Sequence, residues 1–336
     1  MKKSFLCISL LLAGLTSCTN NEVIDVPQEK NTIKFDVPFV KNPTRANTAD
    51  IVNGAVTGIH AFGYYVDPDD PDFENPTKAI DNMNLTNTNG FDSEVLWVAN
   101  KTYTFAAYID GQSNAKIDNA TFSLKNATKS ELLIPSYTEA NKDLLLTITN
   151  DYTVSTTSNL AVALSFRHVL SKLNFNFING EGSTYTMNIS DVTVETVCNT
   201  GTLTATKTAQ GVPFTPVWSL QSGDATQDMG SIAEGIAPTM NASVSCYVIP
   251  QNIRTTCVLN FSVAMTGGTA GPKNATYSVP LYYDTFKYWE PEKCYNYNIT
   301  LYAHNVSSDL SNTIKFTPSV TDWTYSTHNF SPSANP

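Results

Sequence analysis

The chain has 336 residues, of which 41% are hydrophobic, and this is enough apolar material for the cores of two ordinary domains. Only 15% of the residues are charged, against roughly 25% in average soluble proteins. The net charge is −10 and the basic residues are scattered, which argues against a nucleic-acid partner. Thr, Asn and Ser appear in place of the missing charge and favour strands joined by turns.

The first 18 residues, MKKSFLCISLLLAGLTSC, have the pattern of an export signal. Lys2 and Lys3 precede an apolar stretch, Phe5–Leu15, that is too short to span a bilayer. The stretch closes on Cys18 and resembles a bacterial lipoprotein signal, in which residues 1–17 are removed and Cys18 is lipidated. The alternative is an ordinary secretory signal with a chance cysteine. No later segment of the sequence is apolar enough to span a membrane, so anchorage would come from the lipid.

A short strand is predicted in TIKFDVPFV, residues 32–40, where Ile33, Phe35 and Val37 alternate with polar residues. A Pro-containing linker follows, and Arg45 lies in it at a position where a fold has no need of an arginine. The letters NTIKF that open this region recur near the other end of the chain, at residues 312–316.

Period-two alternation continues through almost every apolar segment. KTYTFAAYI at residues 101–109 is one example, and turn residues separate it from the next segment. The same holds for DLLLTIT, STYTMNISDVTVETV, ASVSCYVI, TCVLNFSVAM, ATYSVPLYY and CYNYNITLYA. No stretch shows an apolar stripe at helical spacing. The pattern predicts antiparallel, all-β sandwiches.

The segment AVALSFRHVLSKLNFNF suggests how the strands are organised. Residues 162–166 alternate, residues 173–177 alternate again, and the phase slips between them, which predicts a bulge or a tight crossing. A polar stretch precedes it, so we predict an N-terminal domain at 46–155 and a C-terminal domain at 156–336. His168 lies at the slip and is either a ligand or base, or a structural residue hydrogen-bonded to nearby backbone.

Cysteine usage leaves two alternatives open. Beyond Cys7 and Cys18 the sequence holds Cys198, Cys246, Cys257 and Cys294, with no zinc-site spacing. A two-residue turn at Gln251–Asn252 would set Cys246 opposite Cys257, which allows a disulfide in an exported protein. Otherwise the four are buried free thiols.

The sequence shows no catalytic constellation. The four histidines form no paired motif, and there is no Gly-x-Ser-x-Gly elbow or phosphate-binding glycine loop. A pair of acidic residues meeting in space, as in a glycosidase, would escape such a search, but nothing marks out two of them. We therefore expect no enzyme, no metal site and no cofactor. The aromatic cluster LYYDTFKYWEP, residues 281–291, fits either sugar stacking or core packing.

Several segments together resemble the fimbrillin family, the lipoprotein precursors of type V pili in Bacteroidales. They are the signal ending at Cys18, PTRA at residues 43–46, EVLWVANKTYTFAAY, LSFRHVLSKLNF, YVIPQ, WEPEKCYNYNITL and the closing IKFTPSVTDW. They are spread over nearly the whole chain in the family's order. The family often has a glycine where this chain has Glu292, which we expect to alter only a turn.

The resemblance implies two transthyretin-like β-sandwich domains in tandem. It implies export, lipidation, passage to the outer membrane, and cleavage by an arginine-specific protease between Arg45 and Ala46. Residues 18–45 would leave together, and a strand from another pilus subunit would fill the vacated groove.

The residues explain why such a groove would accept a strand. Without residues 32–40, backbone groups lie unpaired and the places of Ile33, Phe35 and Val37 are empty, so a donated strand recovers both. Ile314 and Phe316 in NTIKFTPSV repeat the pattern of a donor. The alternative is that this segment is the last strand of its own domain. The short tail after Trp323 favours a tip or accessory subunit over a stalk subunit.

Three functions compete. The first is an adhesive pilus subunit, which also contacts a host or bacterial surface ligand. The second is a lipid-anchored surface lipoprotein that binds a glycan or host molecule and does not polymerise. The third is a glycoside hydrolase. Cleavage at Arg45 separates the first from the second, because it would remove the anchor.

Overall fold

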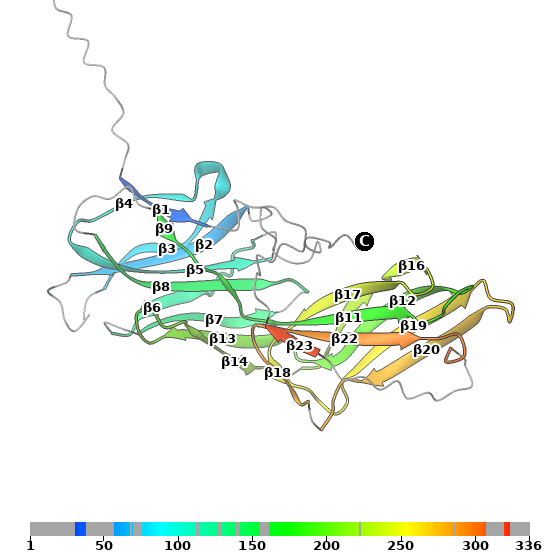
Figure 1. Ribbon diagram of the computed structural model, residues 1–336. Coiled ribbons are helices and arrows are strands. Elements are labelled where there is room, and N and C mark those ends of the chain that lie inside the picture. The colour runs from blue at the N-terminus through cyan, green and yellow to red at the C-terminus, as the bar shows by residue number, and fades with distance from the viewer. Residues whose placement is uncertain are drawn as a thin grey trace, which may run out of the picture. The chain divides into compact units, whose positions relative to one another are not determined.

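The computed structural model describes residues 31–37, 57–67, 69, 76–111, 114–126, 129–138, 141–154, 161–221, 223–284, 286–306 and 319–322. Within these ranges the regular structure consists of β-strands and one short 3-10 helix, Asn87–Asn89 (Figure 1). The predicted all-β class is therefore confirmed. No helix in the described ranges is long and apolar enough to cross a bilayer.

A five-stranded antiparallel sheet runs through the N-terminal half, in the order β10-β8-β5-β2-β3. The strands are β10 (Arg167–His168), β8 (Leu144–Val154), β5 (Lys101–Asp110), β2 (Gly58–Val66) and β3 (Thr77–Thr86). The central strand β5 is buried on both faces. Tyr103 and Phe105 face one hydrophobic core, and Ala106 and Tyr108 face another. This sheet is thus a middle layer with a core on each side.

A three-stranded sheet in the order β4-β1-β9 shares the first core. It consists of β4 (Asp92–Leu96), β1 (Thr32–Asp36) and β9 (Val162–Ala163). The strand predicted after the signal is therefore present, and its described part is shorter than predicted.

A four-stranded sheet shares the second core, in the order β14-β13-β7-β6. Its strands are β14 (Thr215–Leu220), β13 (Thr200–Lys207), β7 (Ser130–Thr138) and β6 (Thr121–Leu124). The β13–β14 hairpin pairs with β7, so strand pairing crosses residue 155. All described residues belong to one unit, residues 31–336. The division into 46–155 and 156–336 stays a prediction.

Two further sheets enclose the third core. One has the order β17-β11-β22-β23, and the other has the order β15-β12-β19-β20 with β16 also paired to β12. The first contains β17 (Asn241–Val248), β11 (Ser171–Asn179), β22 (Lys293–Leu301) and β23 (Ser319–Asp322). The second contains β15 (Ala225–Gly230), β12 (Thr186–Val197), β19 (Val258–Thr266), β20 (Lys273–Pro280) and β16 (Ala233–Ile236). Phe177 meets Phe261 edge-on between them, with ring centroids 4.9 Å apart.

The predicted phase slip at residues 167–172 is a change of sheet. β9, β10 and β11 follow one another in the chain, yet each pairs in a different sheet. The chain crosses from the β1 sheet to the middle layer and then to the third core. Alternation is lost at each crossing because a different set of side chains must face inward.

The predicted turn at Gln251–Asn252 is wrong. These residues form a short strand, β18, which pairs with β21 (Tyr288–Trp289). The buried side chain of Gln251 fixes this path: its Nε2 donates to the carbonyls of Cys198 and Ile249 at 2.9 Å each, and its Oε1 accepts from the Cys198 N–H at 2.9 Å. A polar side chain at 2% exposure needs such partners.

Candidate functional site

Strand β1 is the candidate functional element, and it lies between two short partners. On one side it pairs antiparallel with β4, through Thr32 opposite Leu96 and Lys34 opposite Asp92, with an irregularity between the pairs. On the other side it pairs parallel with β9, through Phe35 beside Val162. Because both neighbours are short and the ladder with β4 is irregular, few backbone bonds hold β1 in its sheet.

Side-chain burial makes up for this sparse pairing. Ile33, Phe35 and Val37 are 0%, 3% and 2% exposed and belong to one core cluster. Lys34 between them is exposed. The side chains predicted to fill the groove do therefore point into the core. Full burial of one such side chain is worth about 1.5–3 kcal/mol, so apolar contact is the main force that retains β1.

Aromatic residues form the floor under β1. The Phe35 ring meets Phe105 of β5 edge-on, with ring centroids 5.3 Å apart. Phe105 in turn meets Trp97 edge-on, with ring centroids 5.9 Å apart. Trp97 also packs edge-on against Tyr103 at 4.7 Å. These edge-to-face pairs are favourable beyond the buried area alone. The segment with Trp97 and Phe105 is one of those that resemble the family in sequence. Nothing in the sequence indicated that these rings lie under β1.

Polar contacts fix the register of β1. The Ser93 hydroxyl donates to the Ile33 carbonyl at 2.7 Å, and the Thr32 hydroxyl donates to Asp92 Oδ2 at 2.9 Å. Burial alone would raise the pKa of Asp92. Hydrogen bonds from the Glu94 N–H and Thr32, with the charge of Lys34, outweigh it and lower that pKa. No sequence signal pointed to Ser93 or Asp92 as residues that bind β1.

The C-terminal end of β1 is hydrogen-bonded to the segment that leads to β10. The Leu164 N–H donates to the Asp36 carbonyl at 3.0 Å. Val162 and Leu164 are fully buried in the same core as Phe35. Loss of β1 would therefore leave the β9 edge unpaired together with the vacant apolar row, and both features favour a replacement strand.

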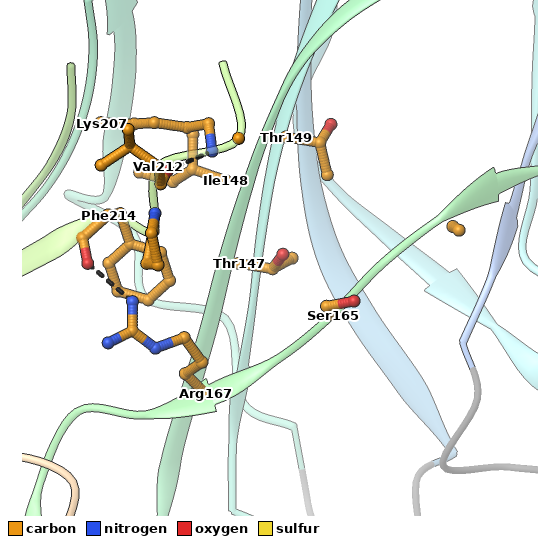
Figure 2. A pocket seen from close by; sticks show the side chains of 11 residues that line it. Thr147, Ile148, Thr149, Ser165, Arg167, Lys207, Val212 and Phe214 are labelled. Carbon is orange, nitrogen blue, oxygen red and sulfur yellow. Dashed lines mark hydrogen bonds between the residues drawn. The ribbon is translucent and has the colours of Figure 1, made fainter. Parts of the chain in front are cut away.

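An open cavity of about 470 Å³ lies beyond this segment (Figure 2). Its walls come from β8, from the segment with Ser165 and Arg167, and from the loop before β14. Lys207 donates to the Val212 carbonyl at 2.7 Å, and Arg167 donates to the Phe214 carbonyl at 2.7 Å. The dashed lines in Figure 2 mark both bonds. Each bond joins a basic side chain of the cavity wall to a backbone carbonyl in the loop before β14.

Glu292 does more than alter a turn, which is the only effect that we expected of it from the sequence. It has a φ of 62°, which is the left-handed conformation that glycine adopts without strain. In addition, its carboxylate pairs with Arg167, with Nη2 at 2.5 Å from Oε1 and 2.7 Å from Oε2. The Arg167 guanidinium also lies over the Phe214 ring at 4.7 Å. Glu292 therefore ties the turn before β22 to β10, beyond altering the turn itself.

Several predicted site residues lie outside the described ranges. They are the lipidation site Cys18, the cleavage pair Arg45 and Ala46, and the donor residues Ile314 and Phe316. Their roles stay predictions.

The described cysteines are free thiols in the structure. Cys246 lies on β17 opposite Leu173, while Cys257 precedes β19 in the facing sheet. Burial raises the pKa of the Cys257 thiol to about 12, so it is an unreactive core residue at neutral pH.

The structure also shows the contacts of two other features that the sequence singled out, His168 and the aromatic cluster at residues 281–291. His168 and Asp143 form a buried pair, with Nδ1 and Oδ2 3.0 Å apart, so the imidazole contacts a carboxylate, whereas the sequence led us to expect nearby backbone. In the aromatic cluster, Trp289 is fully buried and its indole N–H donates to the Tyr297 hydroxyl at 3.1 Å. Tyr288 beside it is exposed.

Comparisons with known proteins show which fold and which family the chain shares. A search of curated proteins found no match. Among solved structures, a fimbrial protein from Bacteroides vulgatus superposes with a TM-score of 0.52 at 17% identity, covering 87% of this chain and 99% of the other. A candidate cell adhesion protein from Bacteroides ovatus gives 0.44 at 16% identity, covering 88% and 96%.

The first of these similarities shows a shared fold. The family comparison shows more than a fold: the model of the fimbrillin-like family matches residues 44–323, which is most of the sequence. This agrees with the resemblance seen in the sequence segments. The chain therefore belongs to the fimbrillin-like family.

Proposed function

We propose that this protein is a structural and adhesive subunit of a surface pilus, assembled by strand exchange after removal of residues up to Arg45. The observation that carries the proposal is the position of β1. It contributes Ile33 and Phe35 to a core, together with Val37 directly after it, and it pairs with only two short strands. Its departure would leave a groove of matching shape and unpaired edges, which another subunit's strand can fill.

Family membership supports the pilus role, and the chain's match to the family model begins at residue 44, next to the predicted cut. A fold relative is itself a fimbrial protein from Bacteroides vulgatus. In this proposal the protein is exported with residues 1–17 as signal, lipidated at Cys18, carried to the outer membrane, and cut by an arginine-specific protease. Its work is assembly and adhesion to a host or bacterial surface, without catalysis.

A tip or accessory position remains part of the proposal, as first inferred from the sequence. The β1 groove is compatible with either position, because a subunit at the tip and a subunit within the stalk would both expose it after cleavage.

The test is the N-terminal sequence and intact mass of the protein from outer-membrane and sheared-surface fractions. We expect a mature chain that begins at Ala46. An Arg45→Ala chain is the matched control and should stay in the membrane fraction with its lipid. A wild-type chain that begins at lipidated Cys18 in every fraction would instead support the anchored, non-polymerising lipoprotein.

A further inference from the structure

Strand β4 contains a bulge where it faces β1. Thr32 pairs with Leu96 and Lys34 pairs with Asp92, so between these pairs β1 advances by two residues while β4 covers four. Regular antiparallel pairing would set Glu94 opposite Lys34. A bulge changes where a side chain points, and here it brings Asp92 to that place.

Two side chains of β4 hold the unusual backbone of this bulge. Glu94 has a φ of 58°, which is the left-handed region that residues other than glycine rarely adopt. Its N–H donates to Asp92 Oδ1 at 2.8 Å. The N–H of Val95 donates to Ser93 Oγ at 3.2 Å. The bulge therefore keeps Asp92 and Ser93 in fixed positions beside β1.

Both side chains also contact β1, in different ways. The Ser93 hydroxyl donates to the Ile33 carbonyl at 2.7 Å, and any strand offers such a carbonyl. Asp92 Oδ2 instead contacts side chains of β1. It accepts from the Thr32 hydroxyl at 2.9 Å and lies 3.6 Å from Lys34 Nζ. Asp92 is therefore the residue whose contacts depend on the sequence of the strand.

The charge of Asp92 makes these contacts selective. Burial alone would raise its pKa, but hydrogen bonds from the Glu94 N–H and Thr32, with the charge of Lys34, lower the pKa, so the carboxylate is ionised at neutral pH. Thr32 is 6% exposed, so water has little access to replace its hydroxyl. A strand with no hydroxyl at this place loses a bond to a charged group. A strand with an acid in place of Lys34 sets like charges opposite each other.

The same contacts oppose a slip of β1 that apolar packing would allow. Side chains alternate with period two, so a shift by two residues keeps the same row facing the core. One such shift would set Asp36 opposite Asp92 and move Lys34 to the place of Thr32. Two carboxylates directly opposite each other are unfavourable, and the hydroxyl contact would be lost. Asp92 therefore distinguishes between registers that the core accepts.

We propose that the Asp92 carboxylate selects the sequence and register of the strand that fills the β1 groove. It favours a hydroxyl residue at the place of Thr32 and a basic residue at the place of Lys34, and it disfavours an acid there. The inward apolar side chains supply most of the affinity, and Asp92 distinguishes one apolar strand from another. Selection of another subunit's strand rests on the proposed strand exchange, whereas selection of β1 itself does not.

The first test is a double-mutant cycle in the full chain, which needs no cleavage. Thr32→Val keeps the shape of the side chain and removes its hydroxyl. It is made in the natural chain and in an Asp92→Asn chain, where the amide has one acceptor oxygen to share between the Glu94 N–H and Thr32. Hydrogen exchange read by mass spectrometry gives the protection of residues 31–37 in each chain.

We expect Thr32→Val to speed exchange in β1 by about tenfold or more in the natural chain, while β11 keeps its protection. In the Asp92→Asn chain the same change should have an effect of under about threefold, because the two residues act as a pair. Equal acceleration in both chains would overturn the proposal, since Thr32 would then act without Asp92.

A surface variant tests the charge without altering a buried group. Lys34→Glu should speed exchange in β1 by about threefold over its matched control, Lys34→Gln. The difference should shrink in about 0.5 M salt and disappear in the Asp92→Asn chain. A difference that is unchanged in the Asp92→Asn chain would also overturn the proposal, because the repulsion would come from another group.

The second test separates this proposal from the proposed function. The folded full chain is cut after Arg45, so that β1 stays in place until another strand replaces it, and labelled peptides of residues 31–40 compete for the groove. We expect the natural peptide to replace β1 at about one tenth of the concentration that the Thr32→Val peptide needs. Equal competition would overturn selection by Asp92 and leave strand exchange intact. If no peptide enters although the first test succeeds, strand exchange fails and the selection of β1 by Asp92 stands.

Discussion

Phe35 is the largest side chain that β1 contributes to the core, at 3% exposure and in edge contact with Phe105. We expect Phe35→Ala to lower the free energy of unfolding by about 3–5 kcal/mol, the usual cost of removing a buried aromatic ring. Lys34→Ala on the same strand is the control, since the Lys34 side chain is about half exposed and its amine lies 3.6 Å from Asp92 Oδ2, and a pair of this kind near the surface is worth under about 1 kcal/mol. Urea unfolding of the unprocessed chain measures both. Similar losses for the two variants would contradict the role given to Phe35.

Glu292 combines a strained backbone with a useful side chain, and two substitutions separate the effects. Both Glu292→Ala and Glu292→Gly lose the ion pair with Arg167. Only glycine also relieves the left-handed conformation at φ 62°. We therefore expect the glycine variant to be more stable than the alanine variant by about 1 kcal/mol, as measured by thermal unfolding. An alanine variant that equals or exceeds the glycine variant would show that the backbone there is not strained.

His60 is buried between strands and stacks on Tyr108 at 5.1 Å. Burial lowers its pKa below 6.5, although hydrogen bonds to the Asn114 and Asn82 backbones partly oppose the shift. Below pH 6.5 the unfolded chain binds a proton that the folded chain still excludes. The stability from a neutral His60 is thus complete above pH 6.5 and is lost as the pH falls through the folded value. Titration of the ring proton by NMR checks this, and a folded pKa above 6.5 would contradict it.

Among single elements, β1 should be the one that a small polar change loosens. Ser93 is 5% exposed and donates to the Ile33 carbonyl, so Ser93→Ala leaves a buried acceptor unsatisfied. This costs about 1–3 kcal/mol. We expect faster amide exchange in β1, while β11 and β22 keep their protection. Hydrogen exchange read by mass spectrometry measures each strand separately, and equal acceleration everywhere would mean that β1 does not open on its own.

The sequence predicts elements well where their side chains alternate. Ile33, Phe35 and Val37 read as an inward row, and all three are buried. The phase slip near His168 likewise marks a real change of sheet. Gln251–Asn252 read as a local turn, yet forms a strand with Tyr288–Trp289. Local letters favour a turn there, whereas the partner and the Gln251 hydrogen bonds come from distant parts of the chain.

At the scale of the whole molecule, the partners of the strands escaped prediction. Period two shows that β5 is a strand, but not that it lies in a middle layer with a core on each face. Nor does it show that the β13–β14 hairpin pairs back onto β7. These contacts join residues far apart in sequence, and alternation carries no information on which edge meets which. The site was predictable only in part. The inward residues of β1 could be named from the sequence, but Ser93 on the neighbouring strand and Trp97 in the core beneath β1 could not.

The groove left by β1 should act as a receptor for a strand of defined pattern. We expect the chain that begins at Ala46 to gain stability from a peptide of residues 31–40, by about 2.7 kcal/mol when the peptide is at 100 times its dissociation constant. The same peptide with Phe35→Ala should bind at least 100-fold more weakly, because the ring fills the site above Phe105. Thermal unfolding across a peptide titration measures both affinities. If the two peptides stabilise the chain equally, side chains do not select the strand, and the groove is recognised through backbone pairing alone.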